Sequence, residues 1–119
     1  MVQEEISELL SESHAWKDSL KNYRESFIQS QKRLLEIAAD VPKEALSELE
    51  RFQNQFYIQL LNIHDARRNL KKHIHNLNVS EDADFTEAHQ ELKQAYQALE
   101  GTIKELSTEF EEFSKHVKS

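Results

Sequence analysis

The chain has 119 residues, a net charge of −7 and no cysteine, which excludes a disulfide framework, a thiolate zinc site and a cysteine nucleophile. It has one glycine and one proline, so β-hairpins and glycine-rich phosphate-binding loops are nearly excluded. The acidic charge disfavours nucleic acid as a partner, and no apolar run reaches the ~18 residues that span a bilayer. The N-terminal residues are acidic and lack the apolar stretch of a signal peptide, so a cytoplasmic location is expected.

Residues 2–41 carry apolar side chains at alternating spacings of four and three, and ten of the twelve positions in this series are apolar. A seven-residue repeat of this length predicts a helix over residues 2–39 with a left-handed coiled-coil seam. Pro42 ends this helix, because the residue before a proline is disfavoured in the helical conformation, and it fits the first position of a new helix. The series consists of Val2, Ile6, Leu9, Ser13, Trp16, Leu20, Tyr23, Phe27, Ser30, Leu34, Ile37 and Val41.

The same spacing recurs in residues 43–77, where eight of ten seam positions are apolar, and it predicts a second helix. The connection between the two helices is only a few residues long, so the helices are expected to run antiparallel. The series consists of Leu46, Leu49, Gln53, Phe56, Leu60, Ile63, Arg67, Leu70, Ile74 and Leu77.

A third helix is predicted over residues 81–117, with either Ser80 or Asp84 as its N-terminal cap. All ten of its seam positions are apolar, but two consecutive spacings of four indicate a stutter near its start. Gly101 is interpreted as an exposed or closely packed helical position and not as a break. The series consists of Phe85, Ala88, Leu92, Tyr96, Leu99, Ile103, Leu106, Phe110, Phe113 and Val117.

Polar residues interrupt the first two seams, and antiparallel pairing places Gln53 beside Ser30 and Arg67 beside Trp16, within a turn of Ser13. Two interpretations remain open. The polar residues form buried layers that fix the register of the helices, or Gln53 and Arg67 lie at the edge of the seam and extend their polar ends into water.

Four cations, Arg67, Arg68, Lys71 and Lys72, gather in the last part of the second helix, where positive charge suits the helix dipole. The favoured interpretation is that acidic residues at the starts of the first and third helices pair with them. The alternative is a docking patch for an acidic partner. The acidic residues concerned are Glu4, Glu5, Glu8, Glu12, Glu81, Asp82, Asp84 and Glu87.

Six histidines suggest a metal site, but none has a glutamate three residues before it, the spacing that places both ligands of a di-iron bundle on one helix face. They are therefore interpreted as surface residues, and no cofactor is expected. The histidines are His14, His64, His73, His75, His89 and His116.

The segment from His64 to Leu70 reads His-Asp-Ala-Arg-Arg-Asn-Leu, which resembles the phospho-accepting H-box of two-component histidine kinases. The resemblance covers seven residues and lacks both the ATP-binding domain and the usual proline of that family. It implies an exposed His64 on a bundle helix that accepts a phosphoryl group, with Asp65 assisting as base.

Together these patterns predict one all-α domain over residues 1–119, an antiparallel up-down-up three-helix bundle that resembles a spectrin-type repeat in helix number and length. Because no enzymatic motif is found, the leading hypothesis is a non-enzymatic interaction or scaffold module that binds a protein or a second copy of itself. The alternatives are histidine phosphotransfer through His64 and a metal-binding or small-molecule-binding bundle. The surplus apolar residues expected to form the interaction stripe are Leu10, Ile28, Leu35, Ile58 and Leu61.

Overall fold

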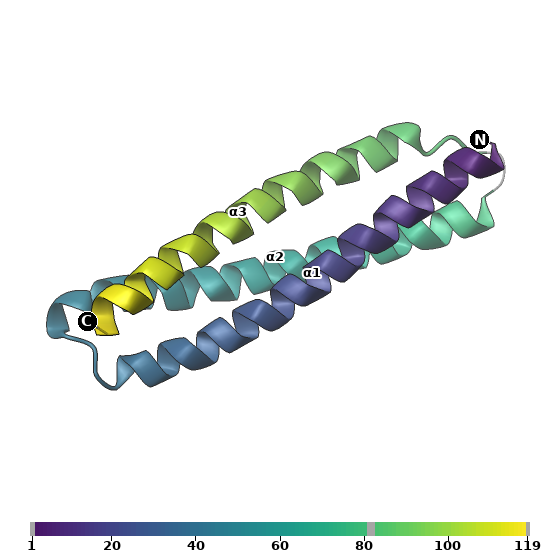
Figure 1. The fold of residues 1–119 in the computed structure, drawn as a ribbon. Helices are drawn as coiled ribbons and strands as arrows, with labels where there is room; N and C mark the ends of the chain where they lie inside the picture. The colour runs from purple at the N-terminus through teal and green to yellow at the C-terminus, as the bar shows by residue number, and fades with distance from the viewer. Residues whose placement is uncertain (1, 81–82, 119) are drawn as a thin grey trace.

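A computed structural model describes residues 2–80 and 83–118, and in that part of the chain every regular element is helical. The elements are α1 (Gln3–Ala38), a 3-10 turn η1 (Lys43–Ala45), α2 (Leu46–Val79) and α3 (Thr86–Lys118). The three long helices lie side by side, with α2 antiparallel to α1 and α3 (Figure 1). The prediction of an all-α, antiparallel three-helix bundle is confirmed.

The bundle is a rod that measures 60 × 17 × 17 Å. A helix of the length of α1 spans about 54 Å at 1.5 Å per residue, so each long helix runs nearly the whole length of the rod. The start of α1, the end of α2 and the start of α3 meet at one end of the rod (Figure 1). The α1–α2 connection and the end of α3 lie at the other end.

Both helix starts that follow a connection lie later in the chain than predicted. Pro42 has an extended backbone (φ −60°, ψ 149°) and precedes η1, so α2 begins at Leu46 rather than at residue 43. The third helix begins at Thr86, whose backbone N–H donates a 2.9 Å hydrogen bond to Asp84 Oδ1. Asp84, and not Ser80, is therefore the residue that caps this helix. The predicted start at residue 81 is wrong for residues 83–85, and residues 81 and 82 lie outside the described part.

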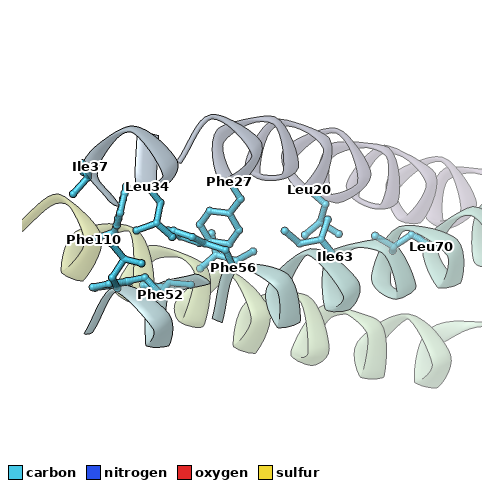
Figure 2. Close-up of a cluster of buried hydrophobic side chains, with 12 residues drawn as sticks. Leu20, Phe27, Leu34, Ile37, Phe52, Phe56, Ile63, Leu70 and Phe110 are labelled. Atoms are coloured by element: carbon cyan, nitrogen blue, oxygen red, sulfur yellow. The ribbon is translucent and has the colours of Figure 1, made fainter. Parts of the chain in front are cut away.

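The core contains a cluster of aromatic rings in the half of the rod that lies nearer the α1–α2 connection. Phe56 is fully buried and its ring lies 5.2 Å from that of Phe27 in α1, 5.0 Å from that of Phe110 in α3 and 6.2 Å from that of Phe52 (Figure 2). Leucine and isoleucine side chains continue the core from this cluster along the rod. One apolar core therefore joins all three helices, as the seam spacing predicts.

In α3 the buried residue near the start of the helix is His89, whereas Ala88 is exposed. With His89 in the series, the spacing alternates between four and three without interruption from Phe85 to Val117. The predicted stutter is wrong. It arose because an apolar residue stands next to the polar residue that occupies the seam.

The face of α2 that turns toward α3 carries Phe52, Gln59, Ala66 and His73 at intervals of seven residues. Gln59 and His73 are buried and Ala66 is half-buried. By contrast, Gln53 is exposed and Arg67 is half-buried. The helix therefore has a second buried line beside the predicted seam.

The predicted polar layers do not form in the described residues. Exposed Gln53 cannot form a buried layer with half-buried Ser30, and buried Ser13 donates a 2.7 Å hydrogen bond to the carbonyl oxygen of Leu9 in its own helix. Gln53 and Arg67 instead lie at the edge of the seam, which was the alternative interpretation.

Candidate functional site

We refer to five of the well-exposed large apolar side chains of α1 and α2 as the apolar stripe; Val79, at the far end of α2, is exposed but does not belong to it. Their exposed fractions are 68% for Leu35, 45% for Leu46, 60% for Tyr57, 37% for Ile58 and 49% for Leu61. The spacing of Leu46, Tyr57 and Leu61 places them on one side of α2, and Ile58, three residues before Leu61, lies on the adjoining part of the exposed surface of the helix.

The register of α1 and α2 brings Leu35 into this group. Phe27 of α1 lies against Phe56 of α2, and the two helices are antiparallel. From this contact, moving toward the α1–α2 connection by the same number of residues on each helix brings Leu35 level with the first turn of α2, where Leu46 is found. Between Leu35 and Tyr57, the surface is hollowed by about 410 Å³ and lined mainly by polar side chains. These are Gln31, Glu50, Gln53 and Asn54, together with Tyr57.

Of the five residues expected to form an interaction stripe, Leu35, Ile58 and Leu61 are exposed. Leu10 and Ile28 are half-buried. Sequence reasoning missed Leu46 and Tyr57 as exposed residues: Leu46 belongs to the apolar series of the second helix, and Tyr57 directly follows Phe56 of that series.

A second feature, the basic hollow, is lined by Lys17 from α1 and by His64, Arg67, Arg68 and Lys71 from α2. Its volume is about 340 Å³. The lining residues of α2 are three and four positions apart, so the helix places them on one face. Three of the four predicted cations therefore meet around one depression, while the fourth, Lys72, is exposed and does not line it.

The prediction that acidic residues at the helix starts neutralise this cluster is wrong for the described residues. The one ion pair of the cluster there joins Arg68 to Asp65 in the same helix, at 3.7 Å. Glu12 lies near His89 instead, and Glu4, Glu5, Glu8, Asp84 and Glu87 make no ion pair with the cluster. Glu81 and Asp82 lie outside the described part.

A third feature is a buried pair of histidines near the end of the rod where α1 starts. His73 Nε2 of α2 lies 3.0 Å from His89 Nδ1 of α3, so one ring donates a hydrogen bond to the other. The exposed fractions of the two residues are only 5% and 4%. The interpretation of the six histidines as surface residues is therefore wrong for this pair, and it is correct for His14, His64, His75 and His116.

Aromatic rings surround the pair. Trp16 of α1 stacks on His89 with 4.9 Å between ring centroids, and Phe85 meets His73 edge to face at 6.2 Å. Glu12 Oε1 lies 3.5 Å from His89 Nε2, which is ion-pair distance but lacks hydrogen-bond geometry. This nitrogen is thus buried without a hydrogen-bond partner.

Burial is the main cause of a lowered pKa at His73, and the positive charge that His89 would carry adds to the effect. The neutral form of His73 is therefore favoured in the folded chain. The arrangement binds the end of α2 to the start of α3 through a hydrogen bond that depends on the protonation state of the rings.

Neither a metal centre nor a membrane span is found in the described residues. No three histidine or carboxylate side chains among residues 2–80 and 83–118 gather closely enough to hold a metal ion. None of the described helices combines the length and the apolar character needed to cross a bilayer.

Comparison with known proteins adds no relative to this picture: no protein-family model, curated protein or solved structure matches the chain significantly. The likeness to spectrin-type repeats is therefore one of helix number and arrangement.

Proposed function

We propose that the chain is a non-enzymatic interaction module that binds a protein helix along the apolar stripe, with a second copy of the chain as the partner to test first. The observation that carries this proposal is the exposure of five large apolar side chains on the adjacent helices α1 and α2, namely Leu35, Leu46, Tyr57, Ile58 and Leu61. Apolar side chains that gather on a surface gain free energy when another apolar surface excludes water from them.

The shape of the rod supports pairing along its length. One long side of a 60 × 17 Å rod offers on the order of 1,000 Å² of surface, and a stable interface needs about 800 Å² per partner. Most closed pairs are symmetric, so the same stripe on two copies meets itself in such a dimer. A helix from a different protein would bind through the same apolar side chains of the stripe.

Association is tested by sedimentation equilibrium over a wide range of protein concentration. The wild-type chain is expected to gain mass with concentration, and a Leu35→Gln/Leu61→Gln variant is expected to remain monomeric. Val79→Gln is the matched control, because Val79 is also 60% exposed but lies at the far end of α2. A chain that stays strictly monomeric at high concentration, or a control that dissociates equally, overturns the proposed self-association.

Phosphotransfer through His64 is a second candidate function, and one observation favours it. His64 is exposed and lines the basic hollow beside Lys17 and Arg67, where cations stabilise a transferred phosphoryl group. Incubation with acetyl phosphate would move the phosphoryl group to an imidazole nitrogen and release acetate. Acid-labile phosphate that is absent from a His64→Gln variant supports this function, and unlabelled wild-type protein rejects it.

A further inference from the structure

The basic hollow gathers positive charge in an otherwise acidic molecule. The chain has 22 acidic and 15 basic residues, yet three α2 cations and Lys17 of α1 surround one open depression. Residues 64, 67, 68 and 71 lie on one face of α2, and α1 contributes the opposite wall. Two helices therefore present positive charge to the same volume.

Most of these charges are not neutralised by the described residues. Arg68 and Asp65 form a 3.7 Å ion pair, but both side chains are more than half exposed to water. Within residues 2–80 and 83–118, Lys17, Arg67 and Lys71 form no ion pair. Like charges held this close repel one another, so the arrangement disfavours the empty hollow and favours a bound anion.

Arg67 provides a second, independent observation. Its Nε atom is buried and has no hydrogen-bond partner among the described residues. A buried donor without an acceptor is costly, and such an atom in a native structure indicates a missing partner. Arg67 also lines the hollow, so an anion bound there would lie beside its guanidinium group.

The chemistry of the lining selects the kind of anion. Arginine presents a planar fork of donors that matches the oxygens of phosphate, and lysine adds a point charge. The lining contains no Phe, Tyr or Trp side chain on which a nucleotide base could stack. At about 340 Å³ the hollow is at the small end of the range of roughly 300–1,000 Å³ for ligand sites, which suits one compact charged group.

We propose that the basic hollow binds a phosphate monoester dianion, carried either by a small free ligand or by a phosphorylated protein side chain. Arg67 and Lys71 hold the oxygens from α2, Lys17 closes the site from α1, and Arg68 contributes from the rim. None of the residues that line the hollow belongs to the apolar stripe, and binding does not require transfer of phosphate to His64. It therefore stands or falls independently of the proposed function.

The test uses the full chain at physiological salt, with amide NMR shifts as the readout of where a ligand binds. Inorganic phosphate is the first probe, and a short peptide with one phosphoserine, compared with its serine counterpart, is the second. Shifts are expected near Lys17 and in residues 64–71. Binding of phosphate identifies a free ligand as sufficient, and binding of the phosphopeptide alone identifies a phosphorylated side chain.

Two double variants separate a built site from general attraction. Arg67→Gln/Lys71→Gln is expected to weaken binding by about tenfold or more. The matched control, Lys32→Gln/Lys115→Gln, makes the same change in net charge at exposed positions outside the hollow and is expected to leave affinity within about twofold of wild type. His64→Gln is expected to retain binding, because the cations carry the site.

Three outcomes overturn the proposal. The first is that neither inorganic phosphate nor the phosphopeptide shifts residues of the hollow. The second is that the serine peptide binds as tightly as the phosphoserine peptide. The third is that the control variant weakens binding as much as Arg67→Gln/Lys71→Gln, since diffuse electrostatics would then account for the effect. Circular dichroism of each variant confirms that the helical fold is retained.

Discussion

His73 links the protonation state of one side chain to the packing of two helices. Its pKa is lowered from the ordinary 6.5, first by burial and then by repulsion from a charged His89. The unfolded chain therefore binds a proton at this residue before the folded chain does, as the pH falls below 6.5. The stabilising effect of neutral His73 is complete above pH 6.5 and is lost as the pH falls toward the lowered pKa.

We predict that the free energy of unfolding falls as the pH decreases from about 8 to about 5, and that His73→Gln weakens this dependence. Glutamine keeps a hydrogen-bond donor near His89 Nδ1 but does not titrate. Urea unfolding at several pH values measures the effect. His75→Gln is the control, because His75 is exposed and lies only two positions away. Equal pH dependence in wild type and His73→Gln would contradict the prediction.

Tyr23 is the residue at which a single hydroxyl joins α1 to α3. Its OH donates a 2.8 Å hydrogen bond to Glu100 Oε2, which also accepts a 2.7 Å bond from Tyr96 OH. Burial and then this hydrogen bond raise the pKa of Tyr23 to about 12, while the bonds from Tyr96 and Tyr23 lower the pKa of Glu100. The charged carboxylate is thus the form that the fold favours.

Removal of this hydroxyl in Tyr23→Phe is predicted to reduce the free energy of unfolding by about 1 kcal/mol near neutral pH. The loss is expected to shrink when the pH falls below the ordinary pKa of Glu100, 4.5, because protonation removes the charged acceptor. Tyr57→Phe is the matched control, since Tyr57 is 60% exposed and no hydrogen bond of its hydroxyl is found in the described part. Equal losses in the two variants would argue against a specific role for the Tyr23–Glu100 bond.

The burial of His73 and His89 could have been predicted from the sequence, whereas the contact between their rings could not. His73 and His89 were available from spacing, because each completes a series of buried positions on its helix. They were missed because the search accepted only apolar residues in the seam. The contact between the two rings depends on the register of α2 and α3, which the helical period alone does not set.

The individual helices were predicted well because each carries a long, regular apolar series. Their starts were predicted less well, since a 3-10 turn after Pro42 and a cap at Asp84 are local choices among several polar residues. The packing of α3 was not predicted: α1 and α2 lie closer to each other than either lies to α3. Large rings such as Trp16 and Tyr96 fill the α3 interface, and larger side chains separate helix axes.

Gly101 lies inside α3, and no neighbouring atom would crowd a larger residue at this position. A Cβ atom added there meets no other atom within 4 Å. Gly101→Ala is therefore predicted to raise the free energy of unfolding by about 1 kcal/mol, since alanine loses less backbone entropy than glycine in a helix. Thermal and urea unfolding of the variant measure this gain.

The reverse substitution at an exposed position of the same helix, Ala98→Gly, serves as the control and is expected to cost a similar amount. If Gly101→Ala were neutral or destabilising while Ala98→Gly behaved as expected, the backbone of Gly101 would have a role that alanine cannot fill. Close approach of a partner helix is the role that small residues most often serve.

At the scale of the whole molecule, the elongated shape makes the mode of self-association measurable. The Cα radius of gyration is 18.2 Å, compared with about 13.5 Å for a compact globule of the same chain length. Two rods paired along their sides would have a radius of gyration of about 20 Å, whereas two rods joined end to end would have one of about 35 Å. The apolar stripe lies on the side of the rod, so it predicts the first arrangement.

Small-angle X-ray scattering over a concentration series checks this prediction. As dimers form, the radius of gyration is expected to rise only slightly, and the maximum dimension is expected to stay near the 60 Å length of the single rod. Leu35→Gln/Leu61→Gln should keep the monomer value at every concentration, because the stripe has lost apolar surface on both helices. A maximum dimension that doubles with concentration would place the contact at the ends of the rod and would rule out the apolar stripe as the interface.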